Sequence, residues 1–311
     1  PTPPPGAKCG VRRAKSPHAL RTPHAALRWG GGAAVRVLFV ADVIGNPGRK
    51  VAKGLLKLLR NELRADAVVL NGENSAGGFG ITPDIVRELL GIGVDVITTG
   101  NHVWDKKEIL PLLDREPRLL RPANYPPGNP GRGSVVVEVA VAGGGPTARL
   151  AVLNLQGRSF MPPIDDPFRA VEAMLAELRE EADAVVIDFH AEATSEKQAF
   201  ARFVDGRVAA VVGTHTHVQT ADERVLPRGT AFITDLGLTG GLGGVIGMKA
   251  EISIERQRLL ARGERMQPAD DELHLQGALV EIDSGTGLAR SIERLSVPYA
   301  RVLEGAFGKK F

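Results

Sequence analysis

Residues 35–63 read VRVLFVADVIGNPGRKVAKGLLKLLRNEL, and the spacing of their apolar residues changes once along the segment. VRVLFVAD is a short apolar run typical of a buried strand. After it, Val51, Leu55, Leu59 and Leu63 recur every four residues, which predicts a helix with one apolar face. A strand followed directly by a helix indicates an α/β fold.

The same alternation continues along the chain. Apolar runs predict strands at 67–70, 94–99, 184–189, 208–212 and 231–235, and helical spacing predicts helices at 83–90, 105–113, 167–182, 195–203 and 251–261. Two pairs of runs are predicted as hairpins, 135–141 with 148–155 around a Gly-rich turn at 143–145, and 277–283 with 289–297. We therefore expect either one mixed β-sheet or two sheets, with helices outside, in a single domain over residues 35–311.

Residues 1–34 have a different composition. They are rich in Pro, Arg and Gly, hold Cys9, the only cysteine, and have no apolar period, so we expect a disordered basic leader outside the fold. GTG is one of the codons for valine, and it can also start translation, as is frequent in GC-rich genomes. We therefore hypothesise that the native chain begins at Val35.

Composition excludes several classes of protein. The absence of a long uncharged apolar run argues against a membrane span or signal peptide, and a single cysteine fits a reducing cytoplasm. The leader holds six of the 39 basic residues and no acidic one, so the remainder carries 33 basic and 36 acidic residues. Dedicated nucleic-acid binding is therefore not expected. A homo-oligomer stays possible.

Metal-type ligands follow five of the predicted strands. They are Asp42, Glu73-Asn74, Asn101-His102, His190 and His215-Thr216-His217. Each has an ordinary structural role when taken alone, such as a turn, a helix cap or a satisfied core histidine. Structural roles give no reason for such residues at every strand end, and in α/β sheets these ends meet in one crevice. The set therefore predicts a metal site. In an extended His-x-His segment, the two rings would point to opposite faces and serve different ions.

The ordered motifs resemble those of calcineurin-like metallophosphoesterases. The chain is similar to the bacterial YmdB-like subfamily over about residues 35–297, in VADVIGNPGR, NGENSAGGFGIT, TTGNHVWD, FMPPIDDPFR, DFHAEATSEK, VVGTHTHVQTAD and TDLGLTG. The resemblance implies that subfamily's fold, a sandwich of mixed β-sheets with helices outside.

The sequence departs from the wider superfamily at two positions. The first motif lacks the histidine of Asp-x-His, and Glu73 stands where a bridging Asp is usual. The resemblance implies one metal ion held by Asp42, Glu73, Asn74 and His217, and a second held by Glu73, Asn101, His190 and His215. Nitrogen and oxygen ligands without thiolate favour Fe or Mn as the two ions.

Such a site indicates phosphoester hydrolysis. Two cations about 4 Å apart lower the pKa of a bridging water, and the hydroxide attacks phosphorus. The resemblance implies small phosphodiesters, 2′,3′-cyclic nucleotides opened to 3′-nucleotides. His102, beside Asn101, is placed to protonate the leaving oxygen or to stabilise the charge of the pentavalent phosphorus. Arg158 and Phe160 could bind substrate or belong to a structural loop, and Asp165 and Asp166 are expected to cap a helix.

The alternative function is a metal-bearing regulator that binds a nucleotide or a partner with little turnover. An intact His102 favours the enzyme. The sequence has no Walker, G-x-G-x-x-G or G-x-S-x-G motif, which argues against nucleoside triphosphatase, dinucleotide-binding and serine-hydrolase functions.

Overall fold

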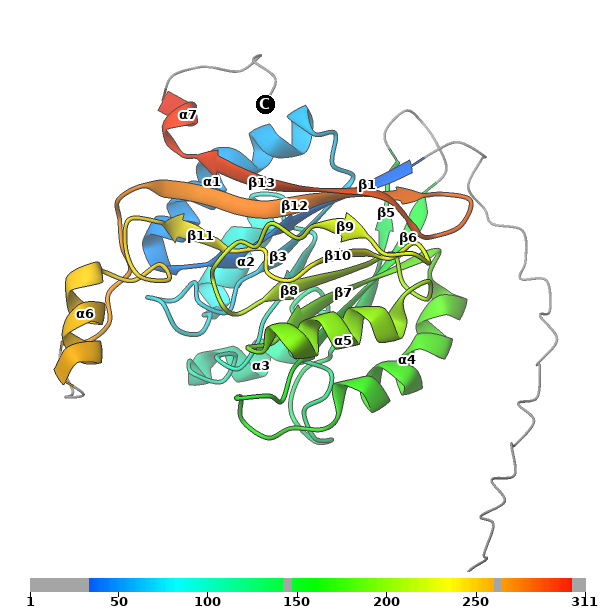
Figure 1. Cartoon of the computed structure of the whole chain (residues 1–311), viewed down its shortest axis with the longest axis horizontal. Helices are drawn as coiled ribbons and strands as arrows, with labels where there is room; N and C mark the ends of the chain where they lie inside the picture. Colours follow the sequence, from blue (N-terminus) through cyan, green and yellow to red (C-terminus); the bar gives the residue numbers. More distant parts are fainter. Residues whose placement is uncertain (1–33, 142–146, 260–263, 304–311) are drawn as a thin grey trace, which may run out of the picture.

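A computed structural model describes residues 34–141, 147–259 and 264–303 of the chain. These segments form two β-sheets packed face to face with helices outside (Figure 1). The first sheet has the order β2-β11-β12-β1-β3-β4, with β13 also paired to β12. Its strands are β1 (Ala34–Val40), β2 (Asp42–Val43), β3 (Ala67–Asn71), β4 (Val96–Thr98), β11 (Leu238–Gly241), β12 (Leu273–Asp283) and β13 (Ala289–Pro298).

The second sheet has the order β5-β6-β7-β8-β10-β9. Its strands are β5 (Ser134–Val139), β6 (Ala148–Gln156), β7 (Ala184–His190), β8 (Ala210–Thr214), β9 (Arg224–Val225) and β10 (Ala231–Ile233). The helices are α1 (Gly45–Glu62), α2 (Pro83–Gly91), α3 (Leu110–Leu113), α4 (Pro167–Glu181), α5 (Thr194–Val204), α6 (Ala250–Leu259), α7 (Ala300–Leu303) and the 3₁₀ helix η1 (Lys107–Ile109).

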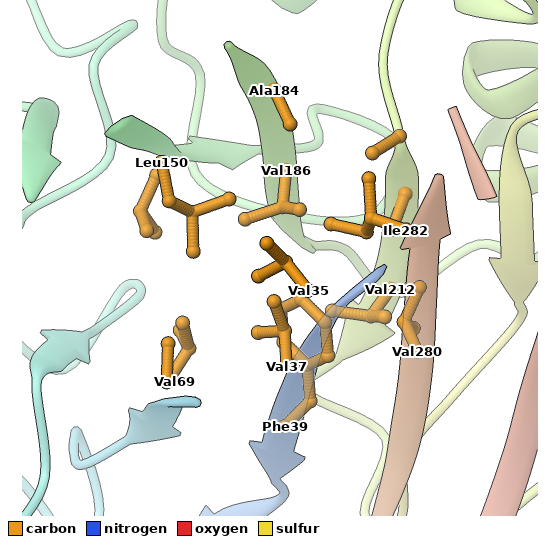
Figure 2. Close-up of a cluster of buried hydrophobic side chains, with 14 of the residues drawn as sticks. Val35, Val37, Phe39, Val69, Leu150, Ala184, Val186, Val212, Val280 and Ile282 are labelled. Atoms are coloured by element: carbon orange, nitrogen blue, oxygen red, sulfur yellow. The ribbon is translucent and has the colours of Figure 1, made fainter. Parts of the chain in front are cut away.

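A layer of apolar side chains holds the two sheets together. Val37 and Phe39 of β1 lie opposite Val186 of β7 and Val212 of β8, and all four are buried (Figure 2). A second cluster packs α1 and α2 on the outer face of the first sheet. A third packs α4 and α5 on the second sheet (Figure 1). The order helix, sheet, sheet, helix confirms the predicted fold class.

The local signals in the sequence account for where the helices form. In α1, the predicted stripe of Val51, Leu55 and Leu59 is buried against the first sheet. Asp166 caps α4, because its Oδ1 accepts the backbone N–H of Phe168 at 2.9 Å. Both predicted hairpins are confirmed, as β5 pairs antiparallel with β6 and β12 with β13.

Four expectations need correction or lie outside the structure. The helix expected at 105–113 is only η1 followed by the single turn α3. The strand expected at 94–99 is shortened to Val96–Thr98. Of the predicted leader, residues 1–33 lie outside the described residues, as does the turn at 143–145, while Ala34 begins β1. Among the helices of the described segments, none combines the length and apolarity needed to cross a bilayer.

Parallel strands bring the predicted ligands to one edge of the sandwich. β1, β3 and β4 are parallel neighbours in the first sheet, and β6, β7 and β8 are parallel neighbours in the second. The two groups meet at their carboxyl ends, where Asn71 Nδ2 of β3 donates to Asp188 Oδ2 of β7 at 3.1 Å. The loops that follow these strands therefore share one edge.

Candidate metal centre

All seven residues predicted as ligands lie together in the structure. One group surrounds His190 Nε2, which lies 2.9 Å from Glu73 Oε1, 3.1 Å from Asn101 Oδ1 and 3.0 Å from His215 Nδ1. Glu73, His190 and His215 each offer one donor atom, and the three atoms lie within 4.8 Å of one another. This spacing suits ligands of a single cation.

The second group also contacts Glu73 Oε1. Asn74 Nδ2 lies 3.4 Å from Glu73 Oε1 and 3.1 Å from His217 Nε2, and His217 Nε2 lies 3.6 Å from Asp42 Oδ1. The Asn74 amide nitrogen, rather than the expected oxygen ligand, thus faces these atoms. A half-turn of the amide group exchanges the two atoms.

Each of the three histidines has its second ring nitrogen held by an acceptor. His190 Nδ1 lies 2.9 Å from Thr214 Oγ1, and His217 Nδ1 lies 3.0 Å from the Ile246 carbonyl oxygen. His215 is turned the other way, with Nε2 3.2 Å from Glu192 Oε2. Such contacts fix the orientation of a ring whose other nitrogen binds a metal.

The hydrogen bonds of Thr214 determine which nitrogen of His190 carries a proton. Thr214 Oγ1 donates its only proton to Asp188 Oδ1 at 2.7 Å, so it must accept from His190 Nδ1. In a neutral ring, the Nε2 lone pair then faces the oxygens of Glu73 and Asn101, which are also acceptors. A proton on Nε2 would serve one of these acceptors, whereas a cation binds them all. The residues present therefore fit a metal ion.

An unpartnered oxygen supports the same conclusion for the second group. Asp42 is fully buried, and its Oδ1 has no hydrogen-bond partner, since 3.6 Å to His217 is too long for one. A buried carboxylate oxygen without a hydrogen bond is costly. A cation beside Asp42 Oδ1 would remove that cost.

The charges of the site favour cation binding. Burial raises the pKa of Asp42, but the interactions with His217, His190 and His215 together outweigh it and lower the pKa to about 2. Burial also raises the pKa of Glu73, and its pairing with His190 lowers that pKa below the usual value. Burial lowers the pKa of His215 to about 3. Both carboxylates are thus ionised and His215 is neutral near pH 7, which are the forms that bind metals. Burial lowers the pKa of His217 and of His190, but pairing with Asp42 raises that of His217 to about 9 and pairing with Glu73 raises that of His190. A cation that binds these two rings therefore displaces a proton from each.

The backbone of the His-x-His segment differs from the extended form that was expected. His215 and His217 have φ values of 99° and 63°, which are uncommon for residues other than glycine. Asp235 Oδ2 accepts the N–H of the intervening Thr216 at 3.1 Å and pairs with the buried Lys197 Nζ at 2.6 Å. The two rings are therefore directed to different neighbours by a bent, anchored backbone.

His102 lies beside the ligand Asn101 and contacts both Glu73 and Asp105. Its backbone N–H donates to Glu73 Oε2 at 3.1 Å, and its Nδ1 lies 2.8 Å from Asp105 Oδ2. The Phe79 ring meets the imidazole edge-on with 5.2 Å between ring centroids. This arrangement leaves Nε2 as the ring nitrogen available for proton transfer.

Arg158 and Phe160 lie on the loop that follows β6. Arg158 Nη2 donates to Asp166 Oδ2 at 3.0 Å, and the Phe160 side chain is 92% exposed. No contact joins either side chain to the ligand groups among the contacts of the described residues. They are therefore part of a neighbouring loop rather than of the metal centre.

Several residues that position the ligands were not predicted. Asp188 and Thr214 look like ordinary members of apolar strands, and Lys197 and Asp235 are far apart in sequence, so nothing in the sequence pattern pairs them. Glu192, two residues after His190 in DFHAE, could have been predicted, because a carboxylate often accepts a hydrogen bond from the second ring nitrogen of a histidine that binds a metal. A cavity of about 760 Å³, lined by Arg60, Arg118 and others, includes none of the site residues.

The fold and the site together define a class. A two-sheet sandwich with histidine, carboxylate and amide ligands at its strand ends is a calcineurin-like metallophosphoesterase, and solved structures support this assignment. A phosphatase from Mycoplasma pneumoniae has a TM-score of 0.78 and 34% identity, covering 87% of this chain and 96% of that one. A hypothetical protein from Thermus thermophilus has a TM-score of 0.76 and 40% identity, covering 85% of this chain and 99% of that one.

Sequence relatives define the family more narrowly. The profile described as "YmdB-like protein" matches residues 38–295. The chain is 47% identical over 263 residues to the 2′,3′-cyclic-nucleotide 2′-phosphodiesterase of Bacillus subtilis (strain 168), covering 85% of this chain and 97% of the relative. The chain belongs to the YmdB-like family, as its motifs predicted.

Proposed function

We propose that this protein is a metal-dependent phosphodiesterase that opens 2′,3′-cyclic nucleotides to 3′-nucleotides. The observation that carries the proposal is that two groups of candidate ligands both contact one oxygen, Oε1, of the buried carboxylate Glu73. The 47% identity to an enzyme named as a 2′,3′-cyclic-nucleotide 2′-phosphodiesterase supports both the enzymatic role and the substrate class.

Two cations, Fe or Mn, fit the two groups. Asp42, Glu73, Asn74 and His217 would hold one ion, and Glu73, Asn101, His190 and His215 the other. A bound pair supplies a water acidified for attack on phosphorus and positive charge for the phosphate oxygens. Asn74 serves as a ligand only after its amide is turned.

His102 has the contacts that a proton donor needs. In the reaction, the oxygen of water bonds to phosphorus, the bond from phosphorus to the ribose 2′ oxygen breaks, and that oxygen takes a proton. The carboxylate of Asp105 lies against Nδ1 of the ring, so it accepts a hydrogen bond from Nδ1 and holds the imidazole in a fixed orientation. Nε2 is then the atom that gives its proton to the 2′ oxygen.

Turnover tests the proposal against the alternative, a regulator that binds nucleotide without hydrolysing it. Protein loaded with Mn or Fe is incubated with 2′,3′-cyclic AMP, and products are followed by phosphorus NMR. We expect 3′-AMP from the wild type and a loss of at least about a hundredfold with Asp42→Asn, which keeps the shape of the side chain and removes its charge. Binding without turnover by fully loaded protein would support the regulator instead.

A further inference from the structure

The loop after β6 leaves the second sheet directly beside the metal centre. In the β6–β7 register, Gln156 is paired with His190. The next residue, Gly157, donates its N–H to the His190 carbonyl oxygen at 2.9 Å. Phe160 is three residues further, so its Cα lies within about 11 Å of that of Gly157.

The side chain of Glu196, near the start of α5, holds the base of this loop. Glu196 Oε1 accepts the N–H of Arg158 at 2.9 Å, and Oε2 accepts the N–H of Ser159 at 3.1 Å. Gly157 allows this contact, since a Cβ at that position would lie 2.5 Å from Glu196 Oε2. The motif DFHAEATSEK therefore supplies both the ligand His190 and the carboxylate that orders the neighbouring loop.

The loop presents a large aromatic ring to solvent. At 92% exposure, Phe160 is the most exposed of the large apolar side chains in the described segments. Its φ of 62° is in the left-handed region, which bulky residues rarely adopt. Leaving a phenyl ring in water forgoes the stabilisation of burial, and sites that bind small molecules are lined largely by hydrophobic and aromatic side chains.

We propose that Glu196 is a positioning residue that orders this loop so that Phe160 stacks against the nucleobase of the substrate. The inference rests on the proposed function. It assigns recognition of the base to Phe160, since the proposed metal ligands act on the phosphate and not on the base. An aromatic ring stacks on any base, because every base has a π-face. The loop then favours cyclic nucleotides over small phosphodiesters without discriminating strongly among bases.

A pair of substrates separates recognition of the base from the chemistry. The kinetics of metal-loaded protein are compared for 2′,3′-cyclic AMP and for ribose 2′,3′-cyclic phosphate, which lacks the base. Phe160→Ala should raise KM for the nucleotide roughly five- to hundredfold, the range of one base stacked on an aromatic ring. KM for the sugar phosphate and the metal content should not change, and Phe160→Trp should restore the nucleotide KM.

Glu196→Gln tests the positioning role. The amide keeps the shape of the side chain but offers one acceptor oxygen where the loop presents two N–H donors, so KM should rise for the nucleotide alone. Two control variants remove similar groups elsewhere in the chain. Leu259→Ala, at the end of α6, matches Phe160→Ala, and α6 projects away from the sheets (Figure 1). Glu172→Gln, on α4, matches Glu196→Gln. Neither should alter either KM.

Two results would overturn the inference, an unchanged nucleotide KM in Phe160→Ala or an equal change for both substrates.

If the wild type hydrolyses neither substrate, the proposed function fails, and calorimetry still tests the loop. In that case 3′-AMP should bind more tightly than ribose 3-phosphate to the wild type but not to Phe160→Ala. Equal affinities in the wild type would refute the stacking role independently of turnover.

Discussion

The orientation of His190 depends on residues outside the proposed set of metal ligands. Its Nδ1 donates to Thr214 Oγ1, which donates to Asp188, and Asp188 also accepts from Asn71 Nδ2 at 3.1 Å. Burial raises the pKa of Asp188 to about 6, although the charge of His190 opposes this shift. Because this pKa is below 7, the carboxylate is mostly ionised at neutral pH and accepts these hydrogen bonds. This chain of hydrogen bonds keeps the Nε2 lone pair directed at the site.

Thr214→Val should weaken metal binding, because valine has the shape of threonine without the acceptor for His190 Nδ1. We expect a loss of about 10- to 100-fold in metal affinity, the usual effect of removing such a partner. Titration with Mn²⁺ measures it, with Thr214→Ser as the control that keeps the hydroxyl. Equal affinities in the valine and serine variants would contradict the role given to Thr214.

His102→Gln should keep both metal ions and lose turnover in a way that depends on the leaving group. For 2′,3′-cyclic AMP we expect a fall of roughly 10²- to 10⁴-fold in kcat, the range of general acid catalysis. A p-nitrophenyl phosphodiester needs little protonation and should lose at least about tenfold less. Equal losses for both esters would remove the acid role, and loss of metal would make His102 a ligand.

At the scale of single residues, the sequence identified the groups that gather at the site but not their orientations. The ligand types stood out because they follow apolar strands. The bent backbone at His215 and His217 could not be predicted, since it depends on Asp235, held by Lys197 of another element. The amide orientation of Asn74 likewise depends on neighbours distant in sequence.

At the scale of elements, the end of β4 brings the backbone unusually close to the site. A Cβ on Gly100 would lie 2.1 Å from His190 Cδ2 and 2.5 Å from Glu73 Oε2. Gly100→Ala should therefore displace these two ligands and lower metal affinity at least about tenfold, while the far-ultraviolet circular dichroism stays that of the wild type.

Gly91→Ala is the matched control, because a Cβ at Gly91, the last residue of α2, has no atom within 4 Å. It should bind metal as the wild type does. Wild-type metal affinity in Gly100→Ala would show that the ligands tolerate a larger residue there and would contradict the close packing of this element.

The elements themselves were predictable to different degrees. Helices with a continuous apolar stripe, such as α1, were predicted almost completely. The helix expected at 105–113 is instead the 3₁₀ helix η1 followed by the single turn α3, because Asp105 bonds to His102 and Pro111 lacks the N–H that would continue one α-helix through this segment. Short strands such as β2 and β9 have too few residues to show an alternating pattern.

At the scale of the whole molecule, stability depends on the layer between the two sheets. Phe39 is 1% exposed and lies in the cluster shared by both sheets (Figure 2). Phe39→Ala should lower the free energy of unfolding by about 3–5 kcal/mol, as expected when a buried phenyl ring leaves a cavity. Urea denaturation measures the change.

Phe160→Ala is the control for this measurement, since it removes the same group from an exposed position and should change the free energy of unfolding by less than about 0.5 kcal/mol. Similar losses in the two variants would mean that the layer between the sheets is not the main source of stability.

The division of strands between two sheets was not predicted. Apolar runs located most strands, and the motifs implied a sandwich, but pairing depends on partners far apart in the chain. β1 pairs with β12, for example, with Val37 opposite Val280. Local patterns carry no information about such pairs, so the sequence left one mixed sheet and two sheets equally open until family resemblance was considered.

Metal stoichiometry tests the central claim, that two cations share Glu73. Protein reconstituted with Mn²⁺ and freed of excess metal is analysed by inductively coupled plasma mass spectrometry. We predict about two ions per chain for the wild type, about one for His217→Ala, and almost none for Glu73→Gln. One ion retained by Glu73→Gln, or a single ion in the wild type, would contradict the shared carboxylate.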